Sequence, residues 1–275
     1  MHTYAYLGPA GTFTEAALKK ICAVGDLRNP YINVTAALDA VRAGEADFAL
    51  VPIENSVEGV VARTLDELAT GEALTIAAEI TLPVTFDLMV KTGTTDIKRI
   101  GTHPHAESQC RVYLSTHFPD AVIFPTNSTA AAAELVAKGE LDAAIASSAA
   151  AENFGLKVIA ENIGDNQVAV TRFIAAQKPG HISAPTGHDR TSLVVYIDID
   201  HAGALLEILS VFAKYDVNLT FIQSRPTGRE LGHYHFIIDV EGHIKDEAVA
   251  KSMEELRAIC DDIRFLGSYP REVRS

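Results

Sequence analysis

VTAALDAVRAGEADFAL, residues 34–50, has a counterpart 95 residues later in TAAAAELVAKGELDAAI, residues 129–145. The shared positions are Ala36, Ala37, Val41, Gly44, Glu45, Asp47 and Ala49 in the first stretch and Ala131, Ala132, Val136, Gly139, Glu140, Asp142 and Ala144 in the second. The same offset pairs Pro9 of YLGPAG with Pro104 of GTHPHA. Two alanine-rich helices can look alike by accident, but accident does not explain two separate matches with one offset. We interpret the pattern as an internal repeat.

Each repeat reads as a strand, a turn and a helix, followed by a helix that ends at glycine and a second strand. In the first repeat these are AYLGPAGTFTEAALKKI (5–21) and AALDAVRAGEADFALVPI (36–53). Alternating strands and helices predict a parallel sheet, so the repeat predicts two α/β lobes facing each other across a groove, a periplasmic-binding-protein-like clamshell. We expect lobes at about 1–76, with a return segment at 168–178, and at about 90–165. The strands at 73–90 and 168–177 are expected to cross between them.

Polar residues follow the predicted strands at the points where helices begin. Ligands of open parallel sheets bind at the carboxyl ends of strands, and helix N-termini attract anions. A single hydroxyl at a helix start is usually only a cap, but five such starts around one groove favour a small-anion site. The segments involved are Gly8 to Thr12, Glu54 to Ser56, His103 with His105, Ser128 with Thr129, and Ser147 with Ser148. The residues expected to bind substrate here are Thr12, Asn55, Ser56, Ser128, Thr129, Ser147 and Ser148.

The last part of the chain has a different organisation. KPGHISAPTGHDR (178–190) is rich in proline, glycine and histidine and predicts a linker at 179–190. Residues 191–275 then predict strand, helix, strand, strand, helix and strand, the order of an α+β ferredoxin-like domain. His233 and His235 lie two apart on one predicted strand and face the same way. A solvated or packed pair explains them better than a ligand site.

Charge and cysteine content restrict the partners. The formal net charge of −13 disfavours nucleic acid and anionic membranes, which are bound mainly by clustered lysine and arginine. Cys22, Cys110 and Cys260 are scattered and lack C-x-x-C spacing, so we expect neither disulfides nor a metal site. The start of the chain lacks the pattern of a signal peptide, and no apolar run is long enough to span a membrane. We therefore expect a cytoplasmic protein.

Seven motifs, in this order, resemble the prephenate dehydratase family along nearly the whole chain. They are GPAGTFTEAA (8–17), PIENSVEG (52–59), THPHAESQC (102–110), NSTAAAA (127–133), TRF (171–173), GALL (203–206) and QSRP (223–226). The resemblance implies a catalytic domain at 1–178 and an ACT regulatory domain at 191–275. It implies a carbon–oxygen lyase that turns prephenate into phenylpyruvate in L-phenylalanine biosynthesis, without a cofactor.

Two other functions remain open at this level. Arogenate differs from prephenate only in carrying an amino instead of a keto group in the side chain, so an arogenate dehydratase would look the same. A non-catalytic clamshell that binds small anions is the other alternative. Solute receptors of that kind need a signal peptide, and transcription regulators need a basic helix-turn-helix; the sequence shows neither.

The reaction implied by the resemblance gives the TRF triplet its roles. The ring hydroxyl and ring carboxylate leave together, and a threonine hydroxyl can donate a hydrogen bond that strengthens as charge grows on the departing oxygen. We therefore expect Thr171 to be catalytic. Phe173 is expected to lie beside the substrate ring. Arg172 either binds a carboxylate or braces the strand.

The ACT resemblance implies an amino acid effector, L-phenylalanine or a related one, and pairing into a homodimer or a dimer of dimers. The expected effector-binding residues are His201, Ala202, Gly203, Ala204, Leu205, Leu206, Asn218, Leu219, Thr220, Gln223, Ser224, Arg225 and Pro226. We expect one chain to supply the helix start and its partner part of the strand. Three positions depart from the family pattern: Gln223 replaces glutamate, Ala202 replaces proline, and His105 stands where glutamine is frequent.

Overall fold

A computed structural model describes residues 1–166, 168–197, 201–227 and 234–272. The chain forms two compact units: Met1–Ala37, Leu50–Val60 and Thr81–Phe173 make the first, and Leu38–Ala49, Val61–Ile80 and Ile174–Ser275 make the second. These units divide the chain differently from the domains expected from the sequence, because the tail forms one unit with segments of the first lobe. Within the described ranges, no helix is long and apolar enough to cross a membrane.

The first sheet has the strand order β2-β1-β3-β11-β5, with β4 paired to β3. Its strands are β1 (Thr3–Leu7), β2 (Leu27–Tyr31), β3 (Phe48–Asn55), β4 (Gly59–Val60), β5 (Thr75–Pro83) and β11 (Val170–Gln177). Strands β1 and β2 are parallel. The helices of this region are α1 (Phe13–Lys19), α2 (Val34–Ala43) and α3 (Ala62–Thr70). Strands β3, β5 and β11 run from one compact unit into the other.

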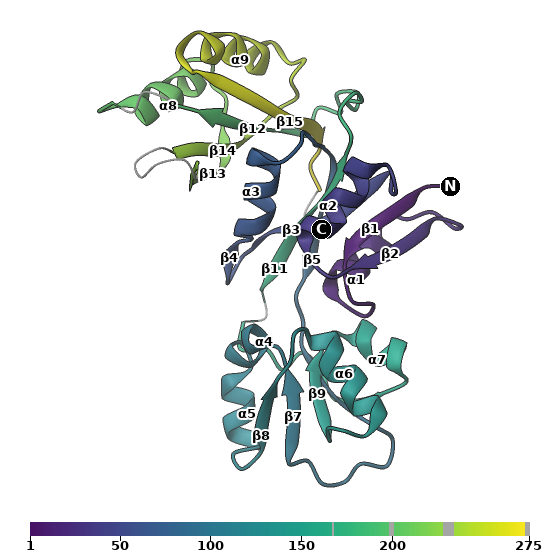
Figure 1. Ribbon diagram of the computed structural model, residues 1–275. Coiled ribbons are helices and arrows are strands. Elements are labelled where there is room, and N and C mark those ends of the chain that lie inside the picture. Colours follow the sequence, from purple (N-terminus) through teal and green to yellow (C-terminus); the bar gives the residue numbers. More distant parts are fainter. Residues whose placement is uncertain (167, 198–200, 228–233, 273–275) are drawn as a thin grey trace. The chain divides into compact units, whose positions relative to one another are not determined.

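The second sheet, entirely in the first compact unit, has the order β10-β6-β9-β7-β8. Its strands are β6 (Asp87–Val90), β7 (Arg99–Thr102), β8 (Val122–Pro125), β9 (Ala143–Ala146) and β10 (Lys157–Ala160). Its helices are α4 (Pro104–Ser108), α5 (Arg111–His117), α6 (Thr129–Lys138) and α7 (Ser148–Phe154), with α5 on one face and α6 and α7 on the other (Figure 1). Buried Leu88, Ile100 and Ile145 contribute to the core between the layers.

The internal repeat is visible in the backbone. Helices α2 and α6 end just before Gly44 and Gly139, whose φ angles of 79° and 82° lie in the left-handed region that favours glycine. A strand follows each glycine, β3 in the first repeat and β9 in the second. The shared glycine is therefore the residue that ends the helix and turns the chain into the sheet.

Two details differ from the expected parallel lobes. The segment 73–90, predicted as one strand, forms β5 and β6, which belong to different sheets. Strands β7, β8 and β9 are parallel, but β6 is antiparallel to β9 and β10 is antiparallel to β6. The reason is connectivity: β6 is the end of a crossing segment and enters the sheet from the other direction.

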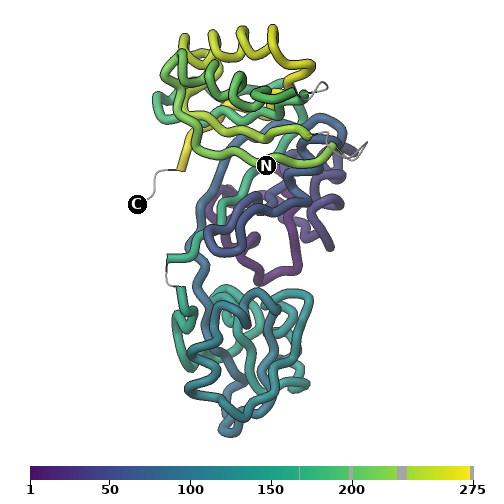
Figure 2. Tube along the Cα trace, turned by 90° about the vertical axis from the view of Figure 1, so that its left-hand side faces the viewer, coloured from purple at the N-terminus to yellow at the C-terminus, as the bar shows by residue number. Residues whose placement is uncertain are grey.

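The tail has the predicted ferredoxin-like order. Its elements are β12 (Asp189–Tyr196), α8 (Ala204–Lys214), β13 (Leu219–Pro226), β14 (Tyr234–Glu241), α9 (Glu247–Ile259) and β15 (Asp262–Pro270), and the sheet order is β13-β14-β12-β15. Figures 1 and 2 show α8 and α9 on one face of this sheet. Phe212, Ile238 and Leu256 are fully buried between them. The fold class predicted from the sequence is confirmed.

His235, on β14, is completely buried, and neither ring nitrogen has a hydrogen-bond partner among the described residues. Its register neighbours are Tyr196 on β12 and Arg225 on β13. Burial lowers the pKa of His235 because the charged imidazolium loses hydration there; the charge of Asp66 opposes this shift, and Arg225 and Arg264 add to it. The expectation of a packed histidine fits His235, whereas His233 lies outside the described residues.

This burial predicts an acid-sensitive second unit. The unfolded imidazole takes up a proton near its ordinary pKa of 6.5, whereas the folded one resists protonation. The unfolded state therefore binds more protons below that pH, and stability falls by up to about 1.4 kcal/mol for each pH unit. Melting temperatures at pH 7.5 and 5.5 should differ less in His235→Met than in the parent. Equal losses in both proteins would contradict this account.

Candidate functional site

Thr171 on β11 and Asn55 at the end of β3 are joined by a side-chain hydrogen bond. Asn55 Nδ2 donates to Thr171 Oγ1 over 2.8 Å. The orientation of the amide is fixed because Asn55 Oδ1 accepts from the backbone N–H groups of Val57 and Glu58, at 2.8 and 2.9 Å. With its oxygen accepting from Asn55, the Thr171 hydroxyl can turn its hydrogen toward another acceptor.

Ser56 holds the backbone beside Thr171. Its N–H donates to the Val170 carbonyl over 2.9 Å, and its Oγ accepts from the Val170 N–H over 3.0 Å. We expected Ser56 to bind substrate, but in the structure its hydroxyl oxygen accepts a hydrogen bond from the backbone of Val170. Asn55 and Ser56 thus hold Thr171 through its side chain and through the preceding peptide.

The other two residues of the TRF triplet are deeply buried. Phe173 has 1% exposure and lies in the core. Arg172 has 8% exposure, and its Nε lies 3.4 Å from Glu54 Oε2. This contact joins β11 to β3. Of the two roles considered for Arg172, bracing the strand and binding a substrate carboxylate, it favours bracing the strand.

Four of the five expected helix starts are present, at α1, α4, α6 and α7. The expectation was wrong for Glu54 to Ser56, because β3 ends at Asn55 and the next helix, α3, begins only at Ala62. Thr12 caps α1, where its Oγ accepts from the Glu15 N–H over 3.4 Å. Ser128 caps α6 by accepting from the Ala131 N–H over 3.0 Å. Thr129 begins α6 and is buried, whereas Ser148 begins α7 and is exposed. Ser147 does not cap its helix with its side chain.

Ser147 instead connects the two repeats. Its Oγ donates to the Gly11 carbonyl over 3.1 Å. The Gly11 N–H donates to Glu15 Oε2 over 2.6 Å, and Asn153 Nδ2 donates to the same oxygen over 3.2 Å. The turn after β1 and the start of α7 are therefore joined by buried polar contacts. Gly11 has a φ of +84°, which a larger residue would adopt only with strain.

A further polar cluster was not assigned from the sequence. Glu58 Oε1 accepts from Gln109 Nε2 over 3.1 Å, and Glu58 Oε2 lies 3.8 Å from His105 Nδ1. The rings of His103 and His105 meet edge to face, 4.9 Å between centroids. Burial lowers the pKa of His103, and the charge of His105 lowers it further. The sequence left these histidines without a role, and no spacing pattern pointed to Glu58.

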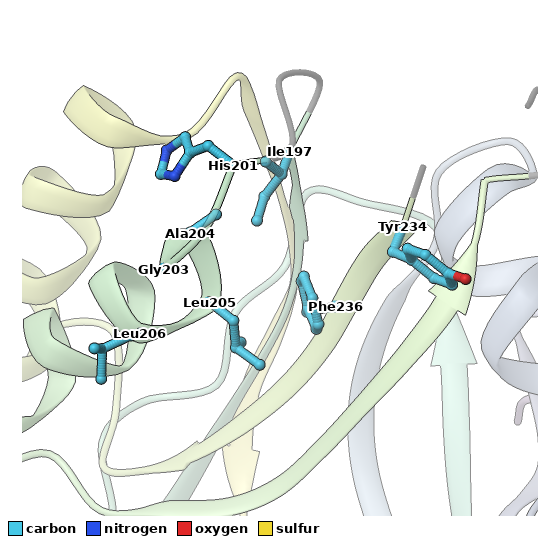
Figure 3. Close-up of a pocket in the computed structure, with 8 residues that line it drawn as sticks. All are labelled: Ile197, His201, Gly203, Ala204, Leu205, Leu206, Tyr234 and Phe236. Carbon is cyan, nitrogen blue, oxygen red and sulfur yellow. The ribbon is translucent and has the colours of Figure 1, made fainter. Parts of the chain in front are cut away.

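The second compact unit contains a cavity of about 180 Å³ at the start of α8 (Figure 3). It is lined by Ile197, His201, Gly203, Ala204, Leu205, Leu206, Tyr234 and Phe236. Five of these were expected; Ile197, Tyr234 and Phe236 were missed because only strand pairing brings them to the helix start. The expected residues Ala202, Asn218, Leu219, Thr220, Gln223, Ser224, Arg225 and Pro226 do not line it.

The role of Ser56 in holding Val170 can be tested. Ser56→Ala should lower turnover roughly tenfold or more, because a small displacement of a reacting group is costly, while stability falls by only about 1 kcal/mol. Ser56→Thr keeps the hydroxyl and should retain most activity. Ser115→Ala is the control, since Ser115 only donates to the Val112 carbonyl on α5. Equal activity of Ser56→Ala and Ser115→Ala would show that this clamp is dispensable.

Residues 4–180 match the prephenate dehydratase family profile, and residues 191–258 match that of the ACT domain. The chain belongs to the prephenate dehydratase family. A prephenate dehydratase of Mycobacterium tuberculosis H37Rv is 46% identical over 277 residues, covering 97% of this chain and 86% of that protein. The enzyme of Mycolicibacterium vanbaalenii is 44% identical over 282 residues, with 97% and 90% covered. The resemblance inferred from the motifs is confirmed.

Solved structures similar to this chain support the same family assignment. The prephenate dehydratase of Arthrobacter aurescens, solved in complex with L-Phe, is 50% identical with a TM-score of 0.92, covering 98% of this chain and 90% of that one. GqqA, described as a novel type of quorum quenching acylase, is 29% identical with a TM-score of 0.87, covering 98% of both chains. The fold is thus shared by proteins with different reported activities.

Proposed function

We propose that the protein converts prephenate into phenylpyruvate, as a carbon–oxygen lyase of L-phenylalanine biosynthesis, at a site around Thr171. The observation that carries the proposal is the hydrogen bond from Asn55 to the Thr171 oxygen, on a chain whose residues 4–180 match the prephenate dehydratase family. The bond presents the threonine as a hydrogen-bond donor, the role that a leaving hydroxyl group requires.

In this mechanism the bond between the ring carbon and the hydroxyl oxygen breaks while the ring carboxylate departs as carbon dioxide. The electron pair of the carbon–carboxylate bond completes the aromatic ring, and the departing hydroxide takes up a proton to become water. Thr171 lowers the barrier by a hydrogen bond that strengthens as the oxygen becomes negative. Because aromatisation drives the reaction, the protein mainly has to orient a dianion.

The carboxylates of prephenate are assigned to the helix starts of the first compact unit. Backbone N–H groups at the beginning of a helix stabilise negative charge, and α6, with Ser128 and Thr129, has ten residues. The start of α7 adds Ser147 and Ser148, and Thr12 opens α1. Such a site holds a dianion locally although the chain carries a net charge of −13.

The test is ultraviolet detection of phenylpyruvate after addition of prephenate, and detection of phenylalanine after addition of arogenate, which keeps its amino group in the product. Faster turnover of arogenate would assign the chain to arogenate dehydration. Binding of either compound without turnover would identify a small-anion binding module and overturn the enzymatic proposal.

Thr171→Val should lower turnover by roughly 10²-fold or more, about the effect of removing one preorganised donor. Valine keeps the shape and strand preference of threonine but removes the hydroxyl. Thr171→Ser keeps the hydroxyl and should retain much more activity. Near-parental turnover in a folded Thr171→Val variant would remove Thr171 from the mechanism.

We further propose that L-phenylalanine binds in the cavity at the start of α8 and regulates the enzyme. An apolar cavity of about 150 Å³ holds a benzene molecule, so the 180 Å³ here admits a phenyl ring. The first N–H groups of α8, an eleven-residue helix, suit the carboxylate. We expect a homodimer, or a dimer of dimers, in which the partner contributes part of strand 218–226 to the site.

Gly203→Asp should abolish the effect of L-phenylalanine on turnover. Gly203 has a φ of +99°, and an aspartate there adds strain and negative charge where the effector carboxylate is placed. Gly25→Asp is a matched control, because Gly25 has a φ of +98° and open space around it in another part of the chain. Activity without L-phenylalanine reports whether each variant has folded. A parental response in Gly203→Asp would place the effector elsewhere.

A further inference from the structure

We propose that the ion pair between Arg225 and Asp66 transmits occupancy of the effector cavity to the segment that carries Asn55. The inference rests on the proposed regulation by L-phenylalanine. The sequence placed Arg225 among the effector-binding residues; here it has a positioning role instead.

The ion pair joins two segments far apart in the sequence. Arg225 Nε donates to Asp66 Oδ1 and Nη2 donates to Oδ2, both over 2.8 Å. This is the planar two-point geometry that distinguishes arginine from lysine. Arg225 belongs to β13, and Asp66 to α3, the helix of the first lobe that lies in the same compact unit.

Two further side chains of the tail hold the end of the same helix. Tyr196 Oη donates to the Ala69 carbonyl over 2.5 Å. Arg264 Nη1 donates to the Leu68 carbonyl over 3.0 Å and to the Gly71 carbonyl over 2.8 Å. The last carbonyls of a helix lack partners within it and favour a cation. Three strands, β12, β13 and β15, therefore fix α3.

Strand alternation connects these contacts to the cavity. Tyr234 and Phe236 line the cavity, and buried His235 lies between them on the opposite face of β14. Ile197 lines the cavity next to Tyr196, which bonds α3. A ligand that shifts β12 on one face therefore shifts Tyr196 on the other. A ligand that shifts β14 acts on α3 through the paired strands β12 and β13, which carry Tyr196 and Arg225.

Arg225 follows the same rule on β13. It pairs in register with His235, whereas its neighbours Ser224 and Pro226 pair with Phe236 and Tyr234 of the cavity. Arg225 is thus one residue away from the cavity side of the sheet, but its side chain reaches α3 instead. This position explains how a residue beside the effector can act without touching it.

The path from α3 to Thr171 runs through β4 and Asn55. Helix α3 begins at Ala62, one residue after β4, and in β4 Gly59 pairs with Asn55. Asn55 in turn donates to Thr171. A change in how α3 is held therefore bears on the turn that orients the catalytic hydroxyl, and a ligand has this effect if it prefers one arrangement over the other.

The experiment compares the parent with Arg225→Gln, Asp66→Asn and a control, Arg257→Gln, which alters an exposed arginine of α9. Calorimetry gives the affinity for L-phenylalanine, and phenylpyruvate formation with and without it gives the response. Hydrogen exchange of the segment 54–70 gives a readout independent of catalysis. Thermal melting verifies folding, and Asp66→Asn tests the pair again from its other side.

We expect both variants to bind L-phenylalanine within about threefold of the parent, whereas the control behaves as the parent. Allosteric coupling typically changes affinity or response by roughly 5- to 150-fold, and in both variants the response should fall to about twofold or less, with no effector-induced change in exchange at 54–70. The double variant should be no worse than either single one, because both remove one interaction.

A full response in folded Arg225→Gln or Asp66→Asn would overturn the coupling role while leaving the proposed function intact. Loss of L-phenylalanine binding in these variants would instead return Arg225 to the effector site and also overturn it. If the parent itself does not bind L-phenylalanine, calorimetry shows this directly; the regulatory proposal then fails together with the inference, whereas prephenate turnover is judged by its own assay.

Discussion

The hydrogen bond between Asn55 and Thr171 is the contact on which the catalytic proposal depends. It joins the end of β3 to the start of β11, 116 residues later in the chain. A threonine hydroxyl has a single hydrogen, and a donor that bonds to its oxygen satisfies the buried oxygen while leaving that hydrogen available for the substrate. Asn55 supplies that donor, and Ser56 holds the backbone at Val170. Both contacts are in place before substrate binds, so the hydroxyl group is preorganised.

The ferredoxin-like sheet of the tail serves two tasks because side chains alternate along a strand. One face packs on α8 and α9 and carries the cavity proposed to bind the effector, whereas the other holds α3 through Arg225, Tyr196 and Arg264. A sheet is stiff across its hydrogen-bonded strands, so a displacement caused on one face also reaches the other. In the proposed regulation the sheet itself therefore carries the displacement, and no separate hinge or loop in the tail has to move.

Local arrangement also reconciles an acidic protein with an anionic substrate. A charge of −13 repels anions on average, but backbone N–H groups at a helix start do not depend on the net charge of the surface. The proposed substrate site and the proposed effector site both use such groups. Their selectivity then comes from the neighbouring hydroxyl groups in one case and from apolar side chains in the other.

The fold class and the family were predictable from the amino-acid sequence. The repeat with its shared Gly44 and Gly139 and the ferredoxin-like order of the tail are local patterns that spacing reveals. The family follows from the resemblance of motifs such as those around Asn55 and Thr171. Which side chains contact one another could not be predicted from these patterns and is seen in the folded chain. Ser56 bonds to Val170, Arg225 bonds to Asp66, Glu58 bonds to Gln109, and Tyr234 and Phe236 line the cavity. The physical reason is that these partners come from distant segments, whose meeting depends on strand register and sheet order and on no periodicity in the chain.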